Sequence, residues 1–153
     1  MRTTHVMHND WSKRERDIHD IVIKNVVGRC KSGECNVLRF LPSEAKIYNV
    51  VVDSMIDNSP DGFRHGAMIL FGEPDGAYGR NLPGSLYGIT VSNVISCGRR
   101  CFTVAGYLSD SAFTNIVNQN PDCPVFYVER ENGIENLSLS SIVTKGKEVI
   151  EYK

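Results

Sequence analysis

Within the segment IHDIVIKNVV at residues 18–27, the apolar residues Ile21 and Ile23 stand two positions apart and polar Lys24 follows, the period that is typical of a β-strand. The same ten-residue pattern returns four more times. The five copies occupy residues 18–27, 47–56, 86–95, 108–117 and 134–143. A second short apolar segment follows each copy, at residues 36–40, 67–71, 101–105, 124–128 and 148–152. Copies that begin 22 to 39 residues apart and keep strand periodicity predict a stack of coils, not a bundle of helices.

A small hydrogen-bonding side chain stands at the eighth position of every copy. These residues are Asn25, Ser54, Asn93, Asn115 and Ser141. Because equivalent residues of stacked coils lie about 4.8 Å apart, their side chains can hydrogen-bond from coil to coil. A buried turn must satisfy its polar groups in this way. The column therefore predicts a bend at which the side chains of Asn25, Asn93 and Asn115 are buried.

The pattern Ile-x-Asn-Ile-x-Ile-x-Asn, with variable loops between its copies, resembles the right-handed parallel β-helix of pectin lyases and polygalacturonases (glycoside hydrolase family 28). The resemblance covers residues 18–152. It implies an all-β fold, a single-stranded right-handed parallel β-helix (solenoid) of about five coils. We expect residues 18–153 to form this domain and residues 1–17 to be an N-terminal cap or the remnant of a preceding coil.

The resemblance also implies where catalysis would take place. Enzymes of this family act on the outward face of one stacked sheet, and inverting hydrolysis needs two carboxyl groups about 6.5 to 9.5 Å apart. The segment RHG resembles the family's Gly-His-Gly motif, so His65 is a candidate catalytic residue, with Asp61 and Glu73 as candidate carboxylates. The Asn-Thr-Asp, Asp-Asp and Arg-x-Lys motifs are absent. A degenerate hydrolase, a polysaccharide-binding protein or a C-terminal fragment of a larger one is therefore expected.

The longest insertion, FGEPDGAYGRNLPG, is the loop on which a rigid solenoid would carry binding residues. Candidate substrate-binding residues there are Asp75, Tyr78 and Arg80, together with Arg64 in front of the preceding strand. A histidine before a strand and the acidic segment DNSPDG are also typical of ordinary solvated turns. These residues are hypotheses of function, and a plain loop is the alternative for each.

Apolar residues of the second strands indicate a different function. Charged Arg39 and Glu151 cannot lie inside the coil, so they must face outward. Because side chains of a strand alternate between its two faces, the residues at equivalent or alternate positions of the short strands are predicted to face outward as well. The apolar residues at these positions are Val37, Met68, Leu70, Phe102, Val104, Val125 and Tyr127. A contiguous exposed apolar stripe usually marks an interface. The alternative hypothesis is a non-catalytic module that self-associates through this stripe, and a third is a fragment of a trimeric viral tailspike-like protein.

Charge and composition narrow the choice of partner. Seventeen Lys and Arg against 18 Asp and Glu leave a formal net charge of -1, which gives no electrostatic reason to expect nucleic acid or an anionic membrane. No apolar run could span a bilayer, and no secretory signal is present, so we expect a cytoplasmic protein, or a secreted one if the chain is part of a longer precursor. We expect no cofactor. The expected partners are an oligo- or polysaccharide, a second copy, or a larger β-helix chain.

Five cysteines stand in a chain without an export signal, a pattern that predicts reduced thiols. They are Cys30, Cys35, Cys97, Cys101 and Cys123. The segments CKSGEC and CGRRC depart from the usual two-residue spacing of a zinc knuckle, and no histidine lies near either pair. The sequence therefore predicts no metal site.

Overall fold

The computed structural model describes residues 7–8, 17–30, 35–42, 45–59, 66–72, 81–146 and 148–153, and within them the only regular elements are β-strands. The long strands are β2 (Ile18–Gly28), β4 (Ile47–Asp57), β6 (Leu86–Ser96), β8 (Leu108–Asn118) and β10 (Ile134–Thr144). The short strands are β1 (Met7–His8), β3 (Leu38–Leu41), β5 (Ala67–Phe71), β7 (Arg100–Val104), β9 (Phe126–Val128) and β11 (Ile150–Tyr152). The described part of the chain is all-β, as predicted.

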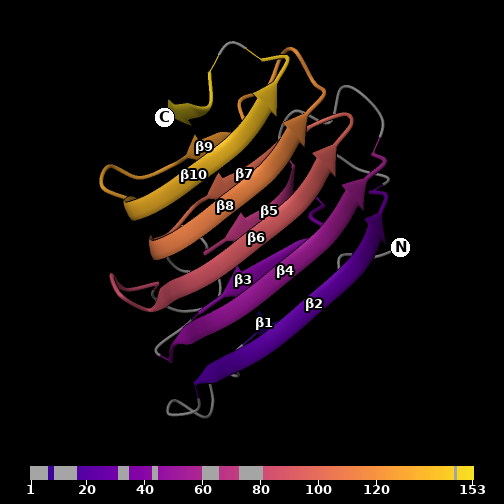
Figure 1. Cartoon of the computed structure of the whole chain (residues 1–153). Coiled ribbons are helices and arrows are strands. Elements are labelled where there is room, and N and C mark those ends of the chain that lie inside the picture. Colours follow the sequence, from indigo (N-terminus) through magenta and orange to yellow (C-terminus); the bar gives the residue numbers. More distant parts are fainter. Residues whose placement is uncertain are drawn as a thin grey trace.

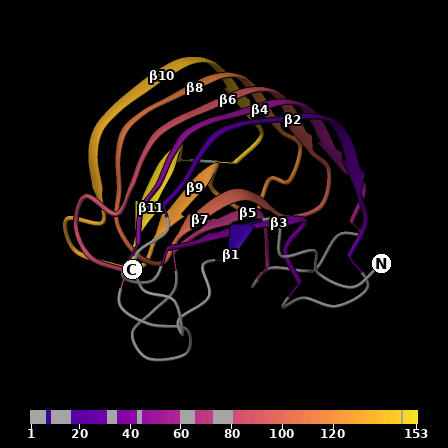
Figure 2. The same cartoon turned by 90° about the horizontal axis from the view of Figure 1, so that it is seen from below.

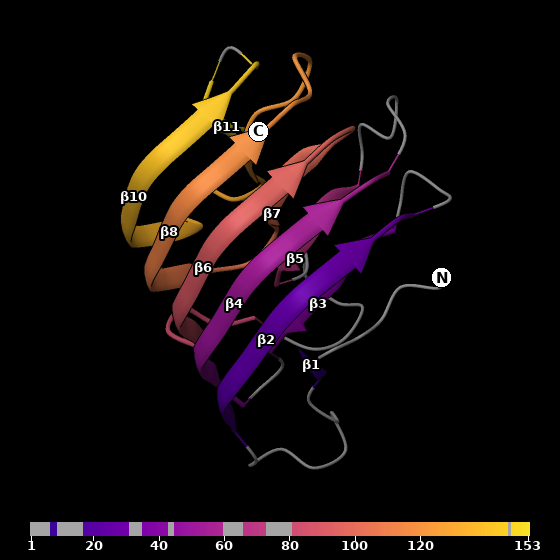
Figure 3. The same ribbon diagram turned by 45° about the vertical axis from the view of Figure 1, so that its right-hand side comes forward.

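Long and short strands form two separate parallel sheets (Figure 1). The five-stranded sheet has the order β10-β8-β6-β4-β2, and the six-stranded sheet has the order β1-β3-β5-β7-β9-β11. The chain alternates between them, so each pass adds one strand to each sheet. Seen from below, the long strands arch over the short ones, and a turned view shows the long strands side by side (Figures 2 and 3).

The register of the five-stranded sheet is the alignment of the five sequence repeats. Ile18 pairs with Ile47, Ile47 pairs with Leu86, and Leu108 pairs with Ile134. Strands β6 and β8 continue the same register, and every pairing is parallel. The prediction that the repeats stack in register is confirmed. The side-chain period alone fixes this register, because a slip of one residue would turn each buried residue outward.

Each long strand bends twice, at residues whose φ is positive. The first bend, with φ between 46° and 64°, is at Asp20, Asn49, Gly88, Asp110 and Asn136. The second, with φ between 52° and 61°, is at Asn25, Ser54, Asn93, Asn115 and Ser141. Residues that tolerate this conformation are chiefly glycine, asparagine and aspartate, which explains most of the residue types in both columns. The sequence predicts only the second bend, at the eighth position of each repeat, and not the first.

The prediction that the asparagines of the second column are buried is wrong. Asn25, Asn93 and Asn115 are exposed, because at the bend their side chains leave the arch on its convex side. The hydrogen bonds between coils nevertheless exist on the surface: Asn115 Nδ2 donates to Asn93 Oδ1 at 2.6 Å, and Asn93 Nδ2 donates to Asp53 Oδ1 at 2.7 Å. The bond from Asn93, followed by one from Ser92, lowers the pKa of the Asp53 carboxyl group.

One aromatic-rich core lies between the two sheets. Phe113 of β8 contacts Phe71, Phe102 and Phe126 of the short strands, with ring centroids 5.9, 5.0 and 4.8 Å apart. All four rings are 0% exposed. Such tilted and edge-to-face pairs each add about 0.5 to 1.5 kcal/mol beyond the burial of their area. Rings from both sheets therefore hold the sheets together.

The prediction that the short strands carry an apolar stripe on their outward side is wrong. The outward column of the six-stranded sheet is instead Arg39, Leu70, Thr103, Tyr127 and Glu151. Of the residues expected outside, Met68, Phe102, Val104 and Val125 are 0% exposed. Parity misplaces Phe102 and Val104 because Thr103, not Val104, is the register partner of Leu70.

Val37, Leu70 and Tyr127 are the other members of the expected stripe, and they are half-buried. Met68 of β5 and Val125, directly before β9, are each followed by another core residue, so two consecutive residues face the core at these points. Strict alternation of inward and outward residues fails at such points. The short strands therefore offer no continuous apolar interface.

All five cysteines lie within the described residues and none of them forms a disulfide. Cys30, Cys101 and Cys123 are buried, and burial raises the pKa of the Cys30 and Cys101 thiols. Because the thiolate is the reactive form, we expect only Cys35 and Cys97 to react rapidly with Ellman's reagent in the folded protein. All five should react after unfolding. Three or more fast thiols in the native protein would contradict this burial.

Candidate functional site

The residues that the sequence predicts for a site lie outside the described residues, so their roles stay predictions. They are Asp61, Arg64, His65, Glu73, Asp75, Tyr78 and Arg80. Both segments adjoin β5, because Gly66 directly precedes this strand and Gly72 directly follows it. Strand β5 belongs to the six-stranded sheet, between β3 and β7. The outward face of this sheet is therefore the described surface nearest to the predicted site residues.

The two ends of the long insertion after β5 meet at Asn81. A Cβ atom on Gly72 would lie 1.9 Å from Asn81 Nδ2, and one on Gly106 would lie 1.8 Å from it, so glycine is needed at both positions. Ser85 Oγ donates a hydrogen bond to Asn81 Oδ1 at 2.9 Å. The insertion therefore leaves and rejoins the coil at one point, next to the carboxyl end of β5.

Thr103 lies in the middle of the outward face, between Leu70 of β5 and Tyr127 of β9. It is only 4% exposed, and its Oγ1 has no hydrogen-bond partner. Among the described residues, three buried side-chain atoms lack a partner: Asn81 Nδ2, Arg100 Nε and Thr103 Oγ1. A buried polar group without a partner costs about 1 to 3 kcal/mol, so these three atoms are unusual in a folded protein.

The guanidinium group of Arg100 lies over the ring of Tyr127, with Cζ 3.8 Å from the ring centroid. Its Nε is the second of the buried atoms without a partner. A cation–π contact of this kind contributes about 0.5 to 2 kcal/mol and holds the planar guanidinium in one orientation. The stack therefore fixes the guanidinium group over Tyr127, which is the register partner of Thr103.

The outward face continues from Tyr127 into an acidic cleft. Tyr127 pairs with Glu151 of β11. The cleft has a volume of about 410 Å³ and is lined by Pro121, Asp122, Cys123, Pro124, Glu148 and Glu151. We expected only Glu151 on the outward face from the sequence and did not expect the other two carboxylates beside it. The sequence does contain a clue to this cluster. Asp122 precedes β9 and Glu148 precedes β11, so the two carboxylates stand at similar places in successive coils.

These carboxylates do not resemble the catalytic pair of a glycosidase. Asp122, Glu148 and Glu151 are all exposed. A general acid must hold its proton at the working pH, which usually requires a desolvated carboxyl group. The cleft is better suited to accept hydrogen bonds from ligand hydroxyl groups.

A second polar cluster is fully enclosed in the coil. Arg99 is 0% exposed, and its guanidinium donates to the carboxylate of Asp57, to the carbonyl oxygen of Cys35 and, at 3.1 Å, to the Sγ of Cys30. It joins the connections that follow β2, β4 and β6. Because no side chain of this cluster reaches solvent, its role is structural.

The convex face of the five-stranded sheet carries a third group, a stack of His19, Tyr48 and Tyr87. Neighbouring ring centroids are 4.8 and 5.1 Å apart, with interplanar angles of 12° and 4°. Because the rings cover each other's faces, little of them is left for a ligand. This stack stabilises the contact between coils, as cross-strand aromatic pairs do.

No protein-family model, curated protein or solved structure matches this chain. The resemblance to the pectin lyase-like fold therefore depends on the repeat pattern and on the parallel all-strand architecture. In the part of the chain that the structure describes, no helix could cross a membrane. Nor do three His, Cys, Asp or Glu side chains of the described residues gather in a way that could hold a metal ion.

Proposed function

We propose that this protein is a right-handed parallel β-helix of the pectin lyase-like kind that binds an oligosaccharide on the outward face of its six-stranded sheet, without hydrolysing it. The fold is supported by the alternation of the chain between two parallel sheets. Crossovers between parallel strands are right-handed in about 98% of cases, which supports the handedness. The function is supported chiefly by the stack of Arg100 on Tyr127 next to the buried hydroxyl of Thr103.

The residue types on this face suit a sugar chain. Guanidinium, carboxylate and phenol hydroxyl groups can hydrogen-bond with pairs of sugar hydroxyls. Thr103, Tyr127 and Glu151 occupy one register column, so they follow one another at the strand spacing of about 4.8 Å. A ligand made of linked rings could follow this column along the axis of the stack.

Replacing Arg100 by Ala is expected to weaken oligosaccharide binding roughly 10- to 100-fold, because hydrogen bonds to a charged group contribute about 1.5 to 3 kcal/mol. Tyr127→Ala should have a similar effect, since it removes both the ring and the support of the guanidinium group. Isothermal titration calorimetry with oligosaccharides from a neutral glucan and from polygalacturonate measures both variants. Release of reducing ends by the unaltered protein should not exceed the blank.

Tyr87→Ala is the matched control, because it removes a half-buried outward tyrosine from the other sheet. It should leave the affinity unchanged. The proposal is wrong if neither class of oligosaccharide binds, or if binding survives in both the Arg100→Ala and the Tyr127→Ala protein. Measurable hydrolysis that disappears in a Glu148→Gln or Glu151→Gln variant would refute the non-catalytic part alone.

A further inference from the structure

The last coil, formed by β10 and β11, leaves the core half exposed. Its inward residues Ile134, Leu137, Leu139, Ile142 and Ile150 are only partly buried. One coil earlier, the equivalent residues Leu108, Ser111, Phe113, Ile116 and Phe126 are 0 to 4% exposed. Both β10 and β11 are edge strands of their sheets, and β10 is the outermost long strand in Figure 3. Within the described residues, nothing covers this end of the stack.

The end is also hollowed. A cleft of about 450 Å³ is lined by the apolar residues Val128, Ile134 and Tyr152 and by the polar residues Arg130, Glu131, Asn132 and Lys153. Tyr152 belongs to the inward column of Val128, yet it is 57% exposed. An edge strand with unpaired N–H and C=O groups beside apolar surface is a template for pairing with another strand.

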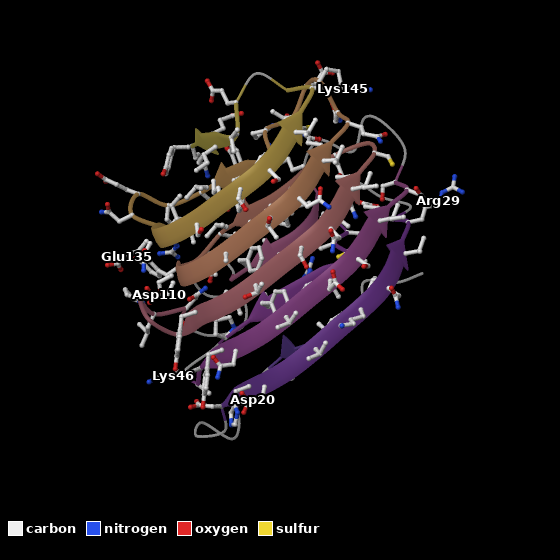
Figure 4. The ribbon with its side chains drawn as sticks, viewed as in Figure 1. Asp20, Arg29, Lys46, Asp110, Glu135 and Lys145 are labelled. Atoms are coloured by element: carbon white, nitrogen blue, oxygen red, sulfur yellow. The ribbon has the colours of Figure 1, made fainter. Side chains whose placement is uncertain are left out.

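Opposite charges stand at the two ends of β10. Glu135 is at its start and Lys145 directly follows its end, and Figure 4 shows them on opposite sides of the sheet. Both are exposed. An antiparallel partner strand of the same sequence, centred near Ser138, would therefore bring Lys145 of each copy opposite Glu131 of the other, which is exposed in the turn before β10.

Stacking of the last coil on the first coil of another copy would be electrostatically unfavourable. The first long strand has the same polarity, with Asp20 near its start and Arg29 just after its end (Figure 4). Parallel pairing of β10 with β2 in the register of the other coils would set Lys145 beside Arg29. Like charges placed opposite each other across strands are destabilising. The charge pattern therefore selects the antiparallel arrangement.

The curvature of β10 is compatible with that arrangement. Its bends, at Asn136 and Ser141, lie at the third position from each end of the repeat 134–143. A reversed copy centred near Ser138 meets each bend within one residue, so the two arches follow the same path. Leu137 of one copy then lies opposite Leu139 of the other, which covers the exposed end of the core.

We propose that two copies of this chain associate through β10 as a two-fold dimer, in which antiparallel pairing joins their five-stranded sheets into one continuous sheet. The interface is isologous, so each contact occurs twice. It replaces the self-association through the short strands that the sequence indicated, and it does not depend on the proposed ligand. The outward face of the six-stranded sheet stays accessible in this dimer.

Sedimentation equilibrium of the 153-residue chain at micromolar concentration and low salt tests the dimer. The unaltered protein should have twice the 17.1 kDa mass of one chain. Glu131→Lys and Lys145→Glu should each raise the dissociation constant about tenfold, because each creates two like-charge contacts. The double variant Glu131→Lys/Lys145→Glu should restore the original dissociation constant, which a folding defect would not do.

Arg29→Glu is the control at the opposite end of the stack, since Arg29 holds the same place after β2 that Lys145 holds after β10. It should leave the dissociation constant unchanged. A strictly monomeric unaltered chain would overturn the proposal, as would a dimer insensitive to both single charge reversals. Species larger than a dimer that Lys145→Glu strengthens would overturn it in favour of head-to-tail stacking. Loss of the dimer in the Arg29→Glu protein would overturn it in favour of the first coil.

Discussion

Replacing Arg99 by Met is expected to lower the free energy of unfolding by about 3 to 5 kcal/mol. Arg99 and its partner Asp57 are both 0% exposed, so the substitution leaves a buried carboxylate without its counter-charge. It also removes donors to the Cys35 carbonyl and the Cys30 thiol. Because a domain of this size has a total stability of about 5 to 15 kcal/mol, the variant should be close to unfolding. Urea denaturation followed by circular dichroism measures the difference.

Arg100→Met is the matched control for this prediction. Arg100 is the next residue in the chain and carries the same charge, but it is half-buried and has no buried ion pair. Its loss should cost no more than about 2 kcal/mol, the upper value for the cation–π contact with Tyr127. Equal destabilisation by the two substitutions would show that the buried pair has no special role.

Replacing Phe113 by Ala is expected to cost about 3 to 5 kcal/mol. This ring is the contact between the two sheets, since it packs against Phe71, Phe102 and Phe126 and is 0% exposed. The neighbouring rings come from three different strands and cannot all move into the space left behind. The same urea titration gives the value.

Val117→Ala, on the outward side of the same strand, is the control for Phe113→Ala. It keeps the strand and its register but removes a half-buried side chain, so a loss below about 1 kcal/mol is expected. If Phe113→Ala cost no more than Val117→Ala, the ring cluster would not be what holds the sheets together.

The coil repeat could be predicted from the sequence because it is written five times. Ile18 and its four equivalents stand at the start of stacked strands, as their alignment indicates. The first bend was not foreseen, because Asp20, Asn49 and Gly88 differ in type and share only a tolerance of positive φ. The exposure of Asn93 was not foreseen either, since its hydrogen bonds between coils can form equally well on a convex surface.

The candidate site was harder to predict. Arg100 stands in the segment CGRRC, whose spacing draws attention to its cysteines. Parity predicts that Phe102 and Val104 face outward, whereas the register partner of Leu70 is Thr103. Asp122 and Glu148 are distant in sequence and meet only because each coil returns to the same place. A cluster of side chains from several coils can be predicted from the sequence only when the register of the short strands is known. The register of the short strands depends on the corners of the coil, where inward and outward residues no longer alternate.

The most direct test of the proposed function is an NMR titration of the ¹⁵N-labelled protein with the tightest-binding oligosaccharide. Backbone amide signals of Leu70, Thr103, Tyr127 and Glu151, the outward column of the six-stranded sheet, should shift with a common dissociation constant. Signals of Tyr48 and Tyr87 on the convex sheet should stay in place. Shifts confined to the convex sheet, or no shifts along the outward column at saturating ligand, would contradict the account.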